Sequence, residues 1–284
     1  MKYTKNKFLI LGGDSKLGNV LKKNLKKNKS NFISTTRKKN QVNKNNIYFD
    51  FVHYKKFVIP NEITLVYICA SINSIEKCEK NKKYTKNINV NITCKLINKF
   101  LQLDIHVIYF STNLIFSGNN VHHTYASKYS AQNQYAKQKI LVEKFLKKHN
   151  KKNYSIIRLG KIIFNKDELF SKWIGAISKN KPISVVVDKY ISPIYITDVI
   201  KAIKVITSNN KYGIFQISAF DYISYQEIAN FMLKKLKKGS NLINLIELKK
   251  SDNVILKSNI PNLKKIKSNY AIKKLFIDNK ISKM

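Results

Sequence analysis

The chain has 284 residues, of which 44% are hydrophobic, so it is long enough to bury a sizeable core. Its 54 lysines and arginines outnumber 16 acidic residues and give a formal net charge of +38. The lysines are spread over the whole chain among many asparagines and isoleucines, and no nucleic-acid-binding module is recognisable, so we expect no specific nucleic-acid partner. The charge would instead help to attract a phosphorylated substrate.

The cysteines and histidines do not form a metal-binding pattern. Cys69, Cys78 and Cys94 show no C-x-x-C spacing, and His122 and His123 have no acidic neighbour. We therefore predict reduced thiols, no bound metal ion and a cytoplasmic location. The first apolar run is too short for a signal peptide and no stretch is long enough to span a membrane, so we expect no membrane partner.

Strands and helices alternate along the first half of the chain, which predicts a doubly wound parallel α/β sheet. The predicted strands are residues 8–11, 32–35, 47–49, 65–70, 106–111 and 154–158. Helices are predicted directly after the first strand, over residues 83–103 and over residues 134–148. The pattern is weaker beyond residue 159, where we predict strands at 185–187 and 213–217 and helices at 199–206 and 225–237. The tail from residue 234 has no assignable pattern.

A glycine-rich turn joins the first predicted strand to the first helix. It reads G-x-x-S-x-x-G and resembles a dinucleotide-binding turn whose middle glycine is replaced by serine. Such a turn needs a tight bend at its first glycine, close helix–strand packing at its last, and backbone N–H groups that face a pyrophosphate. The serine hydroxyl is a further candidate donor to a phosphate oxygen, and a turn that binds nothing is the alternative. The residues concerned are Gly12, Ser15, Lys16, Leu17 and Gly18.

The ends of the second and third strands are expected to meet the adenosine half of a dinucleotide. No carboxylate follows the second strand, and Arg37 there is suited to a 2′-phosphate, so NADPH is favoured while NAD remains an alternative. After the third strand, Asp50 and Phe51 are candidates to border the adenine. A helix cap or a turn is an equally good explanation of Asp50 from its spacing.

Tyr135 and Lys139 lie four residues apart, on one face of a predicted helix. A carbonyl reduction needs a proton donor at the oxygen, and a phenol serves if a neighbouring cation favours its ionised form. Thr112, at the end of the fifth strand, is the candidate hydroxyl that polarises the carbonyl. The spacing alone is weak evidence because Tyr270 and Lys274 repeat it, but only Tyr135 follows such a strand.

With these motifs in place, the chain resembles the extended short-chain dehydrogenase/reductases, and among them the dTDP-4-dehydrorhamnose reductase group. The resemblance runs over nearly the whole length, and its specificity comes from the order and spacing of the segments. These are residues 12–18, 67–71, 75–79, 89–93, 110–118, 135–139, 157–159, 188–195, 197–199 and 213–218. It implies a Rossmann-like fold with an NAD(P)-binding domain at 1–160, completed by about 196–218, and a smaller C-terminal substrate-binding lobe from 161–195 and 219–284.

The resemblance also implies roles for individual residues. Thr112, Tyr135 and Lys139 would be the catalytic set, with Thr112 and Asn113 facing the substrate. Asn113 stands where the group has an aspartate, Ser15 replaces a glycine and Lys161 departs from an aromatic position, which puts the rhamnose-pathway substrate in doubt more than the chemistry. The expected cofactor contacts are Gly12, Ser15, Lys16, Leu17, Gly18, Arg37, Asp50, Phe51, Ala70, Ser71, Tyr135 and Lys139.

Together these features predict an NAD(P)H-dependent reductase of a keto group on a nucleotide-activated sugar, for which we allow a homodimer. A sugar-nucleotide epimerase is the nearest alternative, whereas a dehydratase would need further acid/base carboxylates beside Thr112. A cofactor-binding regulatory subunit with little turnover is an alternative of another class. An anion-binding protein driven by charge is a third, and it would bind with strong salt dependence and without any effect of a cofactor.

Overall fold

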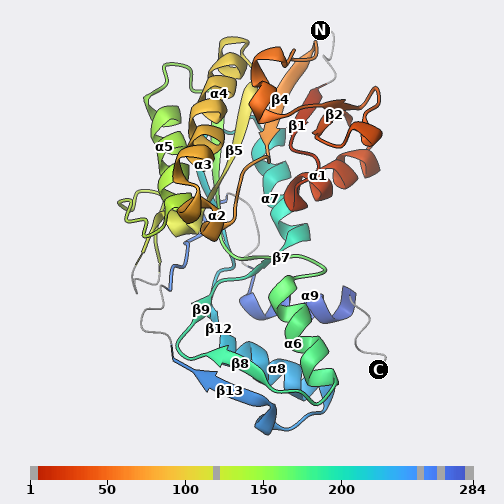
Figure 1. Ribbon diagram of the computed structural model, residues 1–284, viewed down its shortest axis with the longest axis vertical. Helices are drawn as coiled ribbons and strands as arrows, with labels where there is room; N and C mark the ends of the chain where they lie inside the picture. Colours follow the sequence, from red (N-terminus) through yellow and green to blue (C-terminus); the bar gives the residue numbers. More distant parts are fainter. Residues whose placement is uncertain (1–5, 118–121, 248–252, 261–265, 279–284) are drawn as a thin grey trace. The chain divides into compact units, whose positions relative to one another are not determined.

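The computed structural model describes residues 6–117, 122–247, 253–260 and 266–278 (Figure 1). Gly118, part of one segment quoted for the resemblance, lies outside these ranges. The chain forms two compact units. Unit 1 comprises Met1–Ile115, Tyr129–Arg158 and Ile206–Phe215, and unit 2 comprises Phe116–Lys128, Leu159–Val205 and Gln216–Met284. The functional division at residue 160 stays a prediction.

Unit 1 is built on a seven-stranded sheet with the strand order β11-β6-β5-β4-β1-β2-β3. The pairs β1–β2, β1–β4, β2–β3 and β4–β5 are parallel, with Leu9 of β1 opposite Ile33 of β2 and Val66 of β4. The strand order reverses at β1, so the carboxyl ends of β1, β2 and β4 surround the crevice that such folds use for ligands. The bounds are β1 Lys7–Leu11, β2 Asn31–Thr36, β3 Asn46–Tyr48, β4 Ile63–Ile68, β5 His106–Thr112, β6 Tyr154–Leu159 and β11 Gly213–Ile217.

Helices cover this sheet, and α4 and α5 pack against β5 and against each other (Figure 1). The bounds are α1 Lys16–Lys27, α2 Ile75–Lys80, α3 Lys82–Lys86, α4 Thr93–Gln102 and α5 Gln134–Lys148, with short 3₁₀ helices at Lys39–Gln41, Phe51–Lys56 and Asn113–Ile115. The central strands are buried as apolar runs, which explains why the sequence pattern locates them. The helix predicted over 83–103 is confirmed, and it contains a π-helical turn, Asn87–Ile92, between α3 and α4.

Unit 2 contains α6 Glu168–Ser178, α8 Tyr225–Leu236, α9 Ser268–Asp278 and most of α7 Ile196–Ser208. Its short strands pair as β7–β10, β9–β12 and β8–β13, with bounds β7 Ile162–Ile163, β8 Ile183–Val186, β9 Tyr190–Ile191, β10 Ile194–Tyr195, β12 Ile223–Ser224 and β13 Ile243–Ile246. Phe170 and Trp173 of α6 pack edge-on against Tyr225 of α8 and form part of its core. Within the described residues, no helix has the length and apolar character needed to cross a lipid bilayer.

Candidate active site

The glycine turn has the close backbone approaches that a dinucleotide-binding turn requires. Gly12 has a φ of +95°, and a Cβ there would lie 2.6 Å from the backbone N of Ala70. A Cβ at Gly18 would meet the carbonyl oxygen of Gly12. Only glycine therefore fits at either position, and the turn lies directly against Ala70, two residues after the end of β4. This cradle suits a dinucleotide and connects two of the predicted cofactor-binding segments.

Ser15 is the N-cap of α1. Its Oγ accepts a hydrogen bond from the backbone N of Gly18 at 3.0 Å and donates one to the carbonyl oxygen of Gly12 at 2.9 Å. The proton of this hydroxyl is used inside the turn, and a bond from Ser15 Oγ to a phosphate oxygen stays a prediction. Lys16 and Leu17 open α1, and the N-terminal end of a helix is suited to an anion because the helix dipole is positive there.

A carboxylate reaches the end of β2, contrary to the sequence-based expectation. Oδ2 of Asp14, in the glycine turn, accepts hydrogen bonds from Thr36 Oγ1 at 2.7 Å and from the backbone N of Arg37 at 3.3 Å. Thr36 is buried and its hydroxyl also accepts from the backbone N of Lys38. The side chains of Asp14 and Arg37 are both exposed at this strand end. The place that distinguishes NADH from NADPH therefore carries charges of both signs.

Asp50 caps a helix, which is one of the two interpretations that its sequence position allows. Its Oδ1 accepts from the backbone N of Val52, which begins the 3₁₀ helix Phe51–Lys56. Phe51 is buried and its ring packs edge-on against Phe49 at 5.1 Å between centroids. A cavity of about 330 Å³ adjoins Phe49 and Asp50. Contact of Asp50 and Phe51 with an adenine stays a prediction. The residues that line the cavity are Lys39, Tyr48, Phe49, Asp50, His53, Lys56 and Phe57.

Lys139 joins helix α5 to strand β5. Its Nζ donates a 2.9 Å hydrogen bond to the carbonyl oxygen of Phe110, two residues before Thr112, and its side chain is 6% exposed. The same Nζ lies 4.8 Å from the ring centroid of Tyr109 and 5.7 Å from that of Tyr135. Tyr135 and Lys139 are therefore neighbours on one helix face that is anchored to the strand carrying Thr112.

The protonation of this pair differs from the sequence-based expectation. Burial raises the pKa of Tyr135 to about 12, with a smaller contribution from Cys78, so the nearby ammonium does not lower it in this structure. Burial also lowers the pKa of Lys139 to about 8, against the opposing effect of Glu143. At neutral pH the phenol thus holds its proton firmly, whereas the ammonium is close to losing one.

Thr112 ends β5 and is buried. Its Oγ1 accepts from the backbone N of Leu114 at 3.3 Å and donates to Asn113 Oδ1 at 3.4 Å. Both contacts are long, so the hydroxyl is only weakly engaged and remains suited to a stronger acceptor. Asn113 begins the 3₁₀ helix Asn113–Ile115 beside it. The three predicted catalytic residues all belong to unit 1 and to one strand–helix pair.

A buried polar network next to this pair was not predicted. Asn89, in the π-helical turn, donates from Nδ2 to Gln138 Oε1 at 2.8 Å and to the carbonyl oxygen of Ile72 at 2.9 Å. Its Oδ1 accepts from Ser71 Oγ and from the backbone N of Ile72. Gln138 in turn donates to Thr85 Oγ1 at 2.9 Å. The segment predicted to line the cofactor cleft is thereby tied to the residue before Lys139.

A second buried group lies further along α5. Arg158 of β6 contacts the Glu143 carboxylate through Nε and through Nη2, the latter at 2.7 Å, and Tyr129 donates its hydroxyl proton to the same carboxylate at 2.8 Å. Both charged side chains are fully buried. Arg158 thus forms an internal ion pair, and its guanidinium is engaged in the core.

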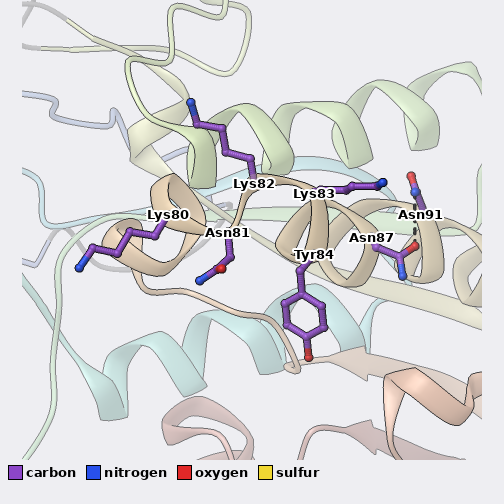
Figure 2. Close-up of a pocket in the computed structure, with 7 residues that line it drawn as sticks. All are labelled: Lys80, Asn81, Lys82, Lys83, Tyr84, Asn87 and Asn91. Carbon is purple, nitrogen blue, oxygen red and sulfur yellow. Dashed lines mark hydrogen bonds between the residues drawn. The ribbon is translucent and has the colours of Figure 1, made fainter.

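Another hollow of the described surface lies elsewhere in unit 1 (Figure 2). It has a volume of about 620 Å³, and every lining side chain is exposed. Figure 2 shows Lys80, Lys82 and Tyr84 pointing away from one another, so they do not converge on a common ligand. The other lining residues are Asn81, Lys83, Asn87 and Asn91. None of the predicted site residues lines it, and no metal-binding cluster of His, Cys, Asp or Glu occurs among the described residues.

Comparison with known proteins gives one decisive match. A family model described as the RmlD substrate binding domain matches residues 6–271, nearly the whole chain. The chain belongs to the RmlD family. The predicted resemblance is thereby confirmed at the level of the family. No curated protein sequence matches the chain significantly.

The RmlD fold of this chain recurs in solved structures of low sequence identity. A dTDP-4-dehydrorhamnose reductase from Bacillus anthracis, in complex with NADP, has a TM-score of 0.81 at 20% identity and covers 96% of this chain and 98% of its own. Its counterpart from Clostridium acetobutylicum has 0.79 at 19%, covering 98% and 100%. A UDP-glucose 4-epimerase from Thermotoga maritima, with UDP-glucose, has 0.77 at 14%, covering 98% and 99%. These likenesses confirm the predicted Rossmann-like α/β fold.

Proposed function

We propose that this chain is an NAD(P)H-dependent reductase that acts on a keto group of a nucleotide-activated sugar. The observation that carries the proposal is the position of Lys139, whose Nζ is held by the Phe110 carbonyl beside the ring of Tyr135. In a member of the RmlD family with an intact glycine turn, this arrangement supports carbonyl reduction. We keep the cytoplasmic location as part of the same proposal.

The residues that would hold the dinucleotide come from the ends of β1, β2 and β4 and from helix α5. The backbone of Ser15, Lys16 and Leu17 would meet the pyrophosphate, because the first N–H groups of α1 are suited to an anion. Ala70 and Ser71 would line the cleft after β4, and Lys139 would hold a ribose hydroxyl. When bound, the nicotinamide would supply the hydride. The proposal covers NADH and NADPH, because Arg37 favours a 2′-phosphate whereas the Asp14 carboxylate disfavours it.

Tyr135 would donate the proton to the carbonyl oxygen of the substrate. Its pKa of about 12 keeps the phenol protonated at neutral pH, so the proton is present when the substrate oxygen gains negative charge. Thr112 would donate a hydrogen bond to the same oxygen, exchanging its long contact with Asn113 for a better one. Lys139, whose pKa lies at about 8, would place a positive charge beside the phenolate that forms. The substrate class follows from the family, and Asn113 would contact the sugar.

The test is NADPH and NADH oxidation by the purified protein with 4-keto sugar nucleotides as substrates. Wild type should turn over, and Tyr135→Phe and Thr112→Val should each lower kcat by about 10²–10⁴-fold. Tyr270→Phe is a matched control, because Tyr270 repeats the spacing to a lysine, with Lys274 Nζ at 5.9 Å from its ring, but lies on α9 in unit 2.

Two outcomes would contradict the proposal. If Tyr135→Phe turns over as fast as wild type, the phenol is not the proton donor. If no keto sugar is reduced while either cofactor raises the melting temperature, the chain is a cofactor-binding regulatory subunit.

A further inference from the structure

We propose that Asp14 determines the cofactor preference of this chain and selects NADH over NADPH. The inference deepens the proposed function and depends on it only for the binding of a nicotinamide dinucleotide. It reverses the preference that Arg37 alone predicts.

The first observation is the position of the carboxylate. Asp14 comes from the glycine turn, yet its Oδ2 lies 2.7 Å from Thr36 Oγ1 and 3.3 Å from the backbone N of Arg37. It thus occupies the carboxyl end of β2, where Rossmann folds hold the adenosine ribose and where an acidic residue accepts hydrogen bonds from its hydroxyls. Among the described residues, Oδ2 takes both bonds and no hydrogen bond reaches Oδ1. Oδ1 is therefore open to a ribose hydroxyl.

The second observation is that the carboxylate of Asp14 is held in place, whereas the cationic side chains beside it are not. The Asp14 carboxylate is held mainly by the 2.7 Å hydrogen bond from the buried Thr36, with a longer contact of 3.3 Å from the backbone N of Arg37. The side chains of Arg37, Lys38 and Lys39 are exposed, and within the described residues no hydrogen bond or ion pair orients them. An exposed cation loses side-chain entropy when it pairs and is screened by salt, so each contributes little.

A 2′-phosphate would be placed directly against the fixed carboxylate. Repulsion between charges about 4 Å apart near a protein surface changes an equilibrium by roughly tenfold or more. A 2′-hydroxyl meets no such repulsion and gains a charge-assisted hydrogen bond. The fixed anion therefore outweighs the mobile cations, and the net preference is for the cofactor without the phosphate.

Binding measurements test the inference without turnover. Dissociation constants for NADH and NADPH are obtained by nicotinamide fluorescence and by calorimetry, for wild type, Asp14→Asn and Arg37→Gln. Asp14→Asn keeps an oxygen for Thr36 and the Arg37 N–H but removes the charge. We expect wild type to bind NADH at least about tenfold more tightly than NADPH, and Asp14→Asn to shift this ratio by about tenfold toward NADPH. Arg37→Gln should shift it less than about threefold.

A second variant keeps the inference testable if Asp14→Asn does not fold. Thr36→Val retains the charge of Asp14 but removes the hydroxyl that fixes it, so the ratio should move part of the way toward NADPH. Tighter binding of NADPH by wild type, or a ratio unchanged in Asp14→Asn, would overturn the inference and leave the proposed reductase intact. Failure of wild type to bind either dinucleotide would overturn both.

Discussion

The side-chain amide of Asn89 donates a 2.8 Å hydrogen bond to the side-chain carbonyl of Gln138, and both residues are buried. The bond connects the π-helical turn to α5, one residue before Lys139. Because Asn89 also binds both backbone groups of Ile72, it holds the segment after β4 in the same arrangement. Removal of either partner leaves the other buried polar group without its hydrogen bond.

We therefore expect Asn89→Ala and Gln138→Ala each to lower the free energy of unfolding by about 1–3 kcal/mol. The double variant should lose less than the sum, by about 0.5–3 kcal/mol, as measured by urea denaturation in a double-mutant cycle. Asn91→Ala is the control, because the 3.4 Å bond from Asn91 to Asn87 is exposed, so its effect should stay below about 0.5 kcal/mol. Additive losses would show that the two residues act independently.

Gly12 and Gly175 offer a contrast for the glycine turn. Gly12→Ala should destabilise the protein by at least about 2 kcal/mol and abolish dinucleotide binding, because its Cβ would collide with Ala70 at a φ of +95°. Gly175→Ala lies within α6 with no atom within 4 Å of the added Cβ, so it should raise stability by about 0.5–1 kcal/mol. Denaturation and calorimetry with NADH measure both. Full dinucleotide binding by Gly12→Ala would show that the turn is not the cofactor site.

Lys139 should make stability depend on pH. Burial lowers its pKa from 10.5 to about 8, so between these values the unfolded chain binds the proton that the folded chain has released. The cost of the buried ammonium is present below pH 8, and stability rises as the pH increases from 8 to about 10. Above that, the raised pKa of Tyr135 acts oppositely, because the unfolded phenol ionises first.

The comparison is urea denaturation of the cofactor-free protein at pH 7.5 and at pH 10, for wild type and Lys139→Met. The stability of wild type relative to Lys139→Met should rise by on the order of 2 kcal/mol between these pH values. Lys137→Met, at an exposed position of the same helix, controls for the loss of one positive charge. A relative stability that falls with pH would show that the buried ammonium is stabilised by its surroundings.

Breaking the ion pair of Glu143 and Arg158 should lower the stability of the protein strongly, whereas replacing both residues with apolar ones should lower it much less. Arg158→Met leaves a fully buried carboxylate without its cation, so we expect a loss of about 3–5 kcal/mol. The double variant Glu143→Leu/Arg158→Met should regain most of that stability, because neither charge remains buried. Thermal and urea denaturation decide between this and the opposite result, in which the double variant is less stable than Arg158→Met.

The sheet and the family could be predicted because both depend on local sequence. Interior parallel strands such as β4 are apolar runs, and the segments that carry the resemblance keep their order along the chain. The family match and the sheet confirm both predictions, and the family match supports the reductase function. The π-helical turn within the helix over 83–103 could not be predicted, because the turn that buries Asn89 depends on partners at residues 72 and 138.

The electrostatics of the site could not be predicted from the sequence for a related reason. The residues along the second strand do not reveal Asp14, because the pairing of β1 with β2 brings this carboxylate from the glycine turn to that strand end. The pKa of Tyr135 depends on burial, which spacing to a lysine does not reveal. Asp50 shows the same limit, since a cap and a ligand contact share one sequence position.

The π-helical turn at Asn87–Ile92 lies between two α-helical halves of one long helix, so the side chains of the two halves point in directions that a regular α-helix would not give. The extra residue of this turn lets one continuous helix bury the polar side chain of Asn89 together with the apolar side chains of Leu96 and Phe100. Deleting one residue here would restore α-helical geometry and change the position from which Asn89 reaches Gln138 and Ile72.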